Sequence, residues 1–365
     1  MAIDANEPRL PIRWRRRLTN RPSPDADFGC ILFDASDLRV AAYSHYSYLF
    51  DAVGLNAHAK AFYVCGQEAV TGHQIRRTRT GTWTELKTRV GSTGTEVVPD
   101  DQLVELSLSL LAPAVKLSPH PFGINYVMIE TKDQSVVDAR EALLEQVQRS
   151  MMISQVVDWV TERFSVPLES IGLTGSVLMS NEPSASDTDL VLFVNPDHAQ
   201  RIEIELDTIT ASSGWDASEY GVKWRYRLRH PELGVICLFL AYSDKRDCPI
   251  DLHTYVPLSE RTDFSVTVTD ATFGGYSPAI YECEGLADGG VVNYLIILGT
   301  AARGAFRRGD VVRGSASLAE MSINNAQTTS LVVAFPFKQL ETFHLRAKRL
   351  QYGRGNQFTN PWLQQ

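Results

Sequence analysis

Thr174-Gly175-Ser176 follows the apolar stretch 170–173, and Asp187-Thr188-Asp189 opens the apolar run 190–194 after a spacer of ten residues. Both apolar stretches predict buried β-strands. Alternate side chains of a strand share a face, so Asp187 and Asp189 point the same way, with Cα atoms about 6.6 Å apart. Two such carboxylates suit a pair of Mg²⁺ ions about 3.5–4 Å apart, and without a cation their repulsion would cost stability. The pattern predicts a metal site, although Asp-x-Asp by itself is also typical of a solvated strand end.

Gly175 and Ser176 lie between the first strand and a short helical turn that we expect after it. A glycine lets the backbone approach a ligand closely, and the free N–H groups at the start of a helix bind phosphate. The Ser176 hydroxyl adds one more donor. We therefore expect Gly175 and Ser176 to bind the phosphates of a nucleotide. The alternative is an ordinary turn without a ligand.

The combined pattern resembles the nucleotidyltransferase signature of the DNA polymerase β superfamily, over roughly residues 150–257. The resemblance implies an enzyme that moves a nucleoside monophosphate from an NTP such as ATP to a hydroxyl acceptor, using two Mg²⁺ or Mn²⁺ ions. It also implies a third carboxylate, for which Asp251 in Pro249-Ile250-Asp251-Leu252-His253 is the best match and Asp244 and Asp247 are competitors. Asp187, Asp189 and Asp251 would then be the catalytic metal ligands.

The whole chain also resembles a largely archaeal group of uncharacterised predicted nucleotidyltransferases. The order of the segments 29–43, 174–193 and 277–281 carries this resemblance. We expect an α+β fold, with a mixed-sheet nucleotidyltransferase core flanked by two further domains. The expected divisions are a basic extended arm at 1–27, an α+β domain at 28–130, the core at 131–257 and a β domain at 258–365.

Periodicity supports part of this division. Apolar residues recur at helical steps from Ser135 to Val160, and 196–210 also predicts a helix. Beyond residue 257, five short strands fit a small OB-like barrel or a sandwich.

Charge is unevenly distributed along the chain, whose net charge is −8. Residues 1–21 have a net charge of +4, residues 300–365 have +6, and the middle therefore holds −18. Basic ends suit a polyanion such as RNA or single-stranded nucleic acid. The candidate contacts are four arginines within eleven residues: Arg303, Arg307, Arg308 and Arg313. The alternative is that these charges dock the basic end onto the acidic centre. A basic and aromatic stretch at 223–229 predicts either ligand contacts or a solvated face.

Composition limits the remaining classes. The chain contains no apolar run long enough to span a membrane, and 1–10 has no apolar core of a secretory signal, so we expect a cytoplasmic protein without a membrane partner. Five scattered cysteines without a C-x-x-C pair argue against a zinc knuckle or a disulfide framework. Two other functions stay open: a nucleic-acid-binding module with a vestigial or nucleotide-sensing core, and a small-nucleotide synthase in defence or signalling. The acceptor, the preferred NTP and the oligomeric state are not determined by the sequence.

Overall fold

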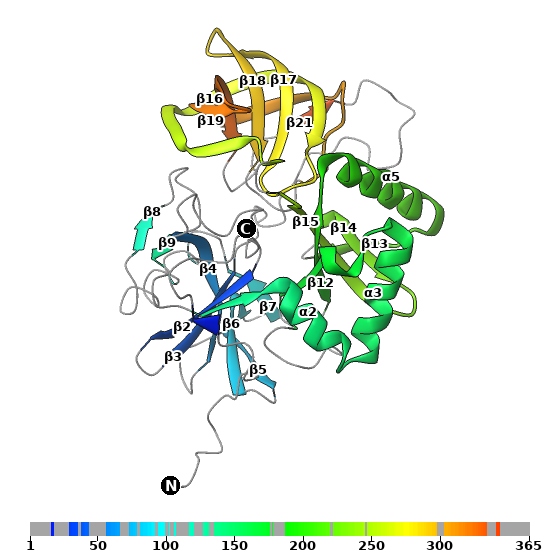
Figure 1. Cartoon of the computed structure of the whole chain (residues 1–365). Helices are drawn as coiled ribbons and strands as arrows, with labels where there is room; N and C mark the ends of the chain where they lie inside the picture. The colour runs from blue at the N-terminus through cyan, green and yellow to red at the C-terminus, as the bar shows by residue number, and fades with distance from the viewer. Residues whose placement is uncertain are drawn as a thin grey trace. The chain divides into compact units, whose positions relative to one another are not determined.

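Two helices and two strands form the local framework of the candidate site in the computed structural model (Figure 1). Helix α3 (Met151–Phe164) begins at Ser150, whose hydroxyl accepts a hydrogen bond from Ile153 N. It buries apolar residues at three- and four-residue steps, as the sequence predicts. Helix α2 (Ala139–Val147) contacts α3 and the short strand β11 (Ile171–Thr174), which follows the 3₁₀ turn Leu168–Ser170.

The structure describes only part of the chain. The described residues are 16–17, 29–35, 38–43, 56–65, 73–78, 81–91, 94–98, 102, 106, 117–119, 127–130, 135–175, 177, 187–219, 222–244, 247–297, 303–333 and 341–343. The expected basic arm at 1–27 lies outside them except for Arg16–Arg17.

The N-terminal part is a ten-stranded sheet. Seven of its strands have the order β1-β10-β2-β3-β4-β6-β5; of the others, β7 pairs with β6, β9 pairs with β4, and β8 pairs with β9. The segment 29–43 forms an antiparallel hairpin of two of its strands. The bounds of the strands are β1 Arg16–Arg17, β2 Gly29–Ala35, β3 Leu38–Tyr43, β4 Asn56–Cys65, β5 His73–Thr78, β6 Gly81–Gly91, β7 Gly94–Val97, β8 Leu117–Pro119, β9 Val127–Glu130 and β10 Ser135–Asp138.

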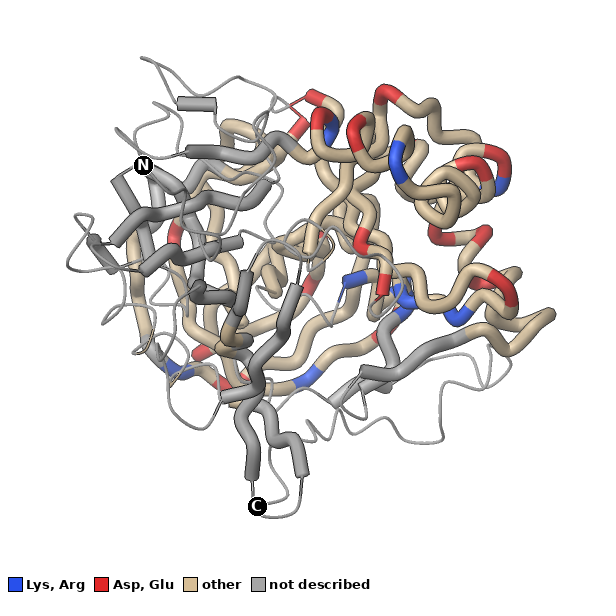
Figure 2. Tube along the Cα trace, turned by 90° about the horizontal axis from the view of Figure 1, so that it is seen from below, with Lys and Arg blue, Asp and Glu red and all other residues tan. Residues whose placement is uncertain are grey.

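A five-stranded sheet with the order β11-β12-β15-β14-β13 follows. The strands after β11 are β12 Thr188–Val194, β13 Asp216–Glu219, β14 Val222–His230 and β15 Gly234–Tyr242. Helix α5 (Pro196–Ser213) begins at Asn195, which accepts a hydrogen bond from His198 N, and ends at Gly214 in the left-handed conformation. Four acidic residues and one arginine lie on α5, and acidic positions recur along the helices in Figure 2.

The C-terminal strands pair in a closed circuit. The pairings run β16-β17-β18-β20-β19 and return from β19 to β16, while β21 adds to β19. One pair in the circuit, β18 with β20, is parallel. Apolar residues fill its centre, where the rings of Tyr281 and Phe306 meet edge to face at 5.2 Å. The strands are β16 Ile250–Phe273, β17 Ala279–Ala287, β18 Gly290–Ile297, β19 Val311–Ile323, β20 Ala326–Val333 and β21 Glu341–Phe343.

The chain is therefore α+β, and it divides into two compact units. One unit comprises 1–120, 125–192 and 230–239, and the other comprises 121–124, 193–229 and 240–365. This division does not test the expected domain boundaries, which stay predictions. One expectation was wrong: Ser135–Asp138 is strand β10, paired with β2, and not the start of a helix. Among the described residues, no helix has the length and apolar character that crossing a membrane requires.

Candidate metal centre

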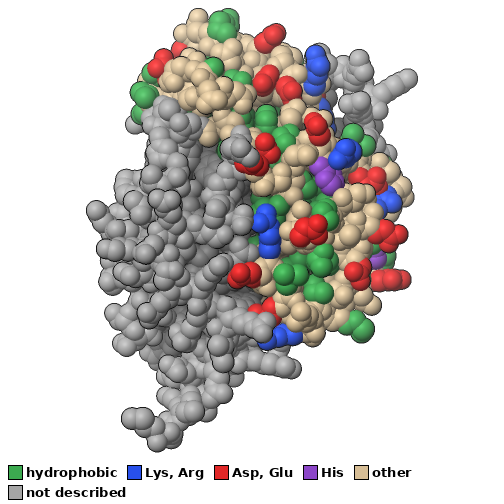
Figure 3. All heavy atoms as spheres, in the orientation of Figure 1, with side chains coloured by type: hydrophobic (Ala, Val, Ile, Leu, Met, Phe, Trp, Pro, Cys, Tyr) green, Lys and Arg blue, Asp and Glu red, His purple; other side chains and the backbone are tan. Residues whose placement is uncertain are grey.

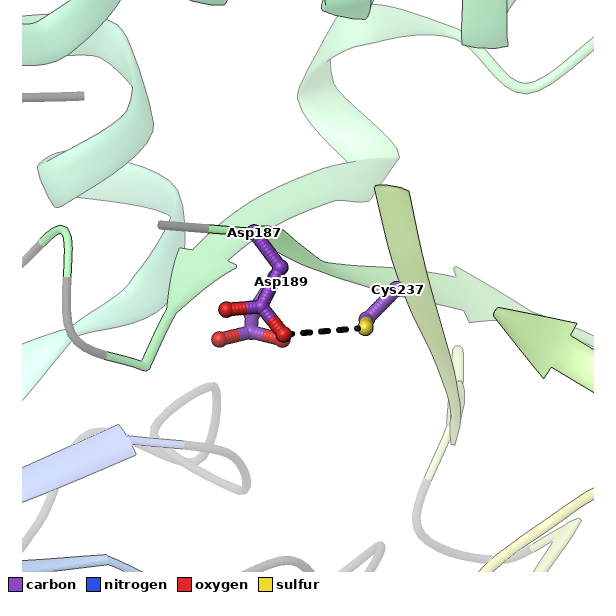
Figure 4. Close-up of side chains that lie close together, drawn as sticks. All are labelled: Asp187, Asp189 and Cys237. Carbon is purple, nitrogen blue, oxygen red and sulfur yellow. Dashed lines mark hydrogen bonds between the residues drawn. The ribbon is translucent and has the colours of Figure 1, made fainter. Parts of the chain in front are cut away.

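Strand β12 positions the two aspartates as the sequence predicts. Its residues from Leu190 to Val194 are buried, while Asp189 near its start and Asp187 just before it are partly exposed. Strand β11 pairs antiparallel with β12, which puts Thr174 directly opposite Asp189. The two carboxylates point the same way in Figure 4. The buried strand therefore presents two carboxylates at an accessible end.

Cys237 of the neighbouring strand β15 completes a group of three potential ligands (Figure 4). Its thiol donates a hydrogen bond to Asp187 Oδ2 at an Sγ–Oδ2 distance of 3.5 Å. One ligand atom from each of Asp187, Asp189 and Cys237 lies within 4.8 Å of the others. Cys237 is only 1% exposed, so the centre has a buried sulfur end and a more open carboxylate end.

Sequence reasoning missed Cys237. Within the continuous apolar run of β15, a cysteine is indistinguishable by sequence from any small buried residue. Only the pairing of β15 with β12, which joins segments far apart in the sequence, brings the thiol to the carboxylates.

Gly175 is in direct contact with the centre. Its φ is +73°, a left-handed conformation that favours glycine. A Cβ atom at this position would collide with the Asp189 carboxylate. The absence of a side chain at Gly175 thus makes room for the Asp189 carboxylate. This role is additional to the expected contact of Gly175 with a phosphate. Ser176 and residues 178–186 lie outside the described residues, so their expected contacts stay predictions.

A buried hydroxyl lies beside the carboxylates. Thr174 is 1% exposed, and its Oγ1 has no hydrogen-bond partner among the described residues. Directly opposed residues of an antiparallel pair lie on the same face with Cβ atoms about 4.5–5.5 Å apart, so Thr174 shares the face of Asp189. A buried hydroxyl without a partner is costly, and it marks a place where a ligand or its water shell would be stabilised.

The expected third carboxylate is not part of the described group. Asp251 lies in β16 opposite Ser322 of β19, in the C-terminal circuit, and its side chain is outside what the structure describes. Asp244 and Asp247 are partly exposed in the turn before it, where Asp247 N donates to Asp244 O at 2.9 Å. The metal-binding role of Asp251 therefore stays a prediction.

The four arginines expected to contact nucleic acid fall into two pairs. Arg303 is 2% exposed, with its guanidinium 5.1 Å from the centre of the Tyr226 ring. Arg307 forms ion pairs with Glu203 and Asp207 of α5, at 3.1 and 3.5 Å. Arg308 and Arg313 are exposed. Three of the four guanidinium groups thus contact other parts of the protein, since Arg313 Nε also donates a hydrogen bond to Ser265 Oγ at 3.3 Å.

A second arginine extends this network. Arg225 contacts Glu203 Oε2 at 3.2 Å and Asp207 Oδ2 at 2.6 Å, and it donates to Gly304 O at 2.8 Å. The Tyr226 hydroxyl donates to Glu203 Oε1 at 2.7 Å. Burial raises the pKa of Glu203 despite the opposing charge of Arg225, and burial also raises the pKa of Tyr226. The basic and aromatic stretch is therefore partly interior, and not simply a solvated face.

No family model, curated protein or solved structure matches this chain. The resemblance to nucleotidyltransferases consequently depends on the residues of the centre themselves.

Proposed function

We propose that the chain is a metal-dependent nucleotidyltransferase that moves a nucleoside monophosphate from an NTP to a hydroxyl acceptor. One observation carries the proposal: the left-handed turn at Gly175 lies directly against Asp189, at the end of a buried strand that also presents Asp187. A glycine turn beside paired carboxylates is the arrangement that nucleotidyl transfer needs, because the turn admits phosphates and the carboxylates hold the cation that neutralises them.

The residues of the centre fit a divalent cation. Two carboxylates supply oxygen ligands, the Thr174 hydroxyl is buried beside them without a partner among the described residues, and Gly175 leaves room for the Asp189 carboxylate. A cation bound there would supply charge stabilisation to the phosphates of the substrate. Asp187 and Asp189 would hold it, the Gly175 backbone would orient the phosphates, and Asp251 remains the proposed third carboxylate.

We further propose that the C-terminal circuit is the expected small OB-like barrel, and that the acceptor is RNA or another single-stranded nucleic acid. The closed strand order and its single parallel pair support the barrel. Exposed Arg308 and Arg313 support a polyanionic acceptor.

A nucleotide-sensing core without transfer activity is the second candidate. The observation that favours it is the third donor beside the two carboxylates, which is a thiol. A site that had lost turnover would keep nucleotide and metal binding but move no label.

Metal-dependent stabilisation by a non-hydrolysable NTP tests the proposal. Ligand at 100 times its Kd stabilises a protein by about 2.7 kcal/mol, so the Tm of the full chain should rise when Mg²⁺ or Mn²⁺ and the analogue are both present. The double variant Asp187→Asn/Asp189→Asn should lose this rise. Asp158→Asn/Glu162→Gln removes the same charge from the exposed face of α3 and should keep it.

Transfer itself is tested with each labelled NTP, with and without total RNA. Label that moves onto RNA, a protein or a small molecule identifies the acceptor and supports the enzyme. Binding without any label transfer would support the nucleotide-sensing core. If the wild-type protein shows no metal-dependent stabilisation, or the double variant keeps it, the proposed site is wrong.

A further inference from the structure

We infer that Cys237 is a metal ligand and that the centre takes a single thiolate-accepting divalent ion of the zinc class through Asp187, Asp189 and Cys237, rather than the two Mg²⁺ ions that the family resemblance implies. This inference rests on the metal site of the proposed function, but it does not depend on nucleotide transfer.

The chemistry of the donor atoms indicates which metal the centre binds. Mg²⁺ demands oxygen ligands and dehydrates reluctantly, so a buried sulfur beside two carboxylates does not suit it. Thiolate ligands select softer ions, and zinc accepts sulfur and carboxylate oxygen in one site. The sulfur cannot move aside into solvent, because Cys237 is 1% exposed in the interior of β15.

The distances between the ligand atoms agree with those of a zinc site. In a tetrahedral zinc site, metal–ligand distances of about 2.3 Å to sulfur and 2.0–2.2 Å to oxygen put those two ligands about 3.5–3.7 Å apart. The Sγ of Cys237 lies 3.5 Å from Asp187 Oδ2. The ligand atoms of all three residues lie within 4.8 Å of one another, so they reach a common ion with little rearrangement.

The surroundings supply an independent indication of a ligand. The Thr174 Oγ1 is buried on the face of Asp189 and has no hydrogen-bond partner among the described residues. Three protein ligands also fit a catalytic type of zinc site, since structural zinc sites use four and catalytic ones keep a position for water or substrate. Among the described residues the group has three donors, with its carboxylate end partly exposed.

When the ion binds, it replaces the proton on the sulfur of Cys237. The S–H bond of Cys237 breaks, its proton passes to solvent, and the sulfur lone pair forms the bond to the ion. The hydrogen bond that the thiol now donates to Asp187 is lost, and that Oδ2 becomes free to bind the same ion. No oxidant or reductant takes part.

Cobalt substitution tests the inference, since Co²⁺ occupies zinc sites and a thiolate–cobalt bond gives charge-transfer absorption in the near ultraviolet. The full chain loaded with Co²⁺ should show this band, and Zn²⁺ should abolish it stoichiometrically. Cys237→Ser should lose the band and bind Zn²⁺ at least about tenfold more weakly. Cys248→Ser is the matched control and should keep the band, because Cys248 is not in the group.

The outcomes separate this inference from the proposed function. A circular dichroism spectrum and Tm close to wild type show that Cys237→Ser folds, and Asp187→Asn provides a second variant that should weaken the band while the thiol is intact. A wild-type protein that binds Co²⁺ without the band, or a Cys237→Ser variant that keeps it, overturns the inference even if NTP stabilisation is normal. A normal band without any NTP stabilisation leaves this inference standing and defeats the proposed function.

Discussion

At Gly175 the backbone has a φ of +73°, and a Cβ atom would collide with the Asp189 carboxylate. Gly175→Ala should therefore have two effects. The left-handed backbone should cost about 1–3 kcal/mol of folding stability. The displaced carboxylate should in addition abolish metal-dependent binding, which isothermal titration with Mn²⁺ and with Zn²⁺ would measure.

Gly214→Ala separates the two effects. Gly214 has a similar φ of +65°, but among the described residues, its chain neighbours aside, no heavy atom lies within 4 Å of the place where its Cβ would be. This variant should lose stability and keep its metal affinity. Equal metal affinities for Gly175→Ala and Gly214→Ala would show that the glycine does not position Asp189.

The residues of the centre differ in how far the sequence predicts them. Asp187, Asp189 and Gly175 are predictable because a strand alternates its side chains and charges are conspicuous in an apolar run. Cys237 is not, because its role depends on which strand lies beside β12, and pairing between distant segments leaves no local signal. The same limit applies to Asp251, because a strand was expected there but its pairing with β19 was not.

At the scale of elements, the hydroxyl of Tyr226 on β14 joins this strand to Glu203 on α5. Tyr226→Phe retains the ring beneath Arg303 and removes only the hydrogen bond to a buried carboxylate. It should cost about 1.5–3 kcal/mol of unfolding free energy, measured by urea denaturation.

Tyr294→Phe is the matched control for Tyr226→Phe. Its hydroxyl also contacts a glutamate, Glu282, but at 3.5 Å and with partial exposure. The cost there should be below about 1 kcal/mol. Equal losses in the two variants would contradict a special role for the buried network.

Glu203 should also make stability depend on pH. Because burial raises its pKa above 4.5 in the folded state, the folded protein holds the Glu203 proton more tightly than the unfolded chain does. As pH rises from about 4.5 through the raised pKa, this group therefore lowers the stability of the protein. Glu203→Gln removes that loss, so its Tm relative to wild type should increase from about pH 4 to pH 8. A flat difference in Tm between Glu203→Gln and wild type across this pH range would contradict the raised pKa.

The sequence predicts helices and strands correctly where the apolar residues repeat with a single period, as in α3, α5 and β12. It was wrong at β10, where Val136 and Val137 continue the helical spacing of the apolar residues that follow. Their pairing with Ile31 and Cys30 of β2 overrides that local pattern. Backbone pairing across a hundred residues thus decides an assignment that a short window of sequence cannot.

At the scale of the whole molecule, acidic and basic side chains are interspersed on the described surface seen in Figure 3. Residues 300–365 have a net charge of +6, but part of this charge is on side chains that contact other parts of the protein. Arg307 forms ion pairs, and Arg303 is buried. The docking alternative therefore accounts for Arg307, which pairs with Glu203 and Asp207 of α5. Arg308 and Arg313 are the two that are exposed to a polyanion.

Binding of a single-stranded RNA oligonucleotide should accordingly be weak and only moderately dependent on salt. Each phosphate contact on a single strand contributes about −0.7 to the slope of log K against log salt, so two contacts contribute about −1.4. Arg308→Ala/Arg313→Ala should reduce the measured slope by that amount in a fluorescence anisotropy titration. Arg201→Ala/Arg229→Ala removes the same charge from exposed positions on α5 and β14 and should leave the slope unchanged. Equal slopes for all three proteins would place nucleic-acid binding elsewhere, and no binding by the wild-type protein would favour a small-molecule or protein acceptor.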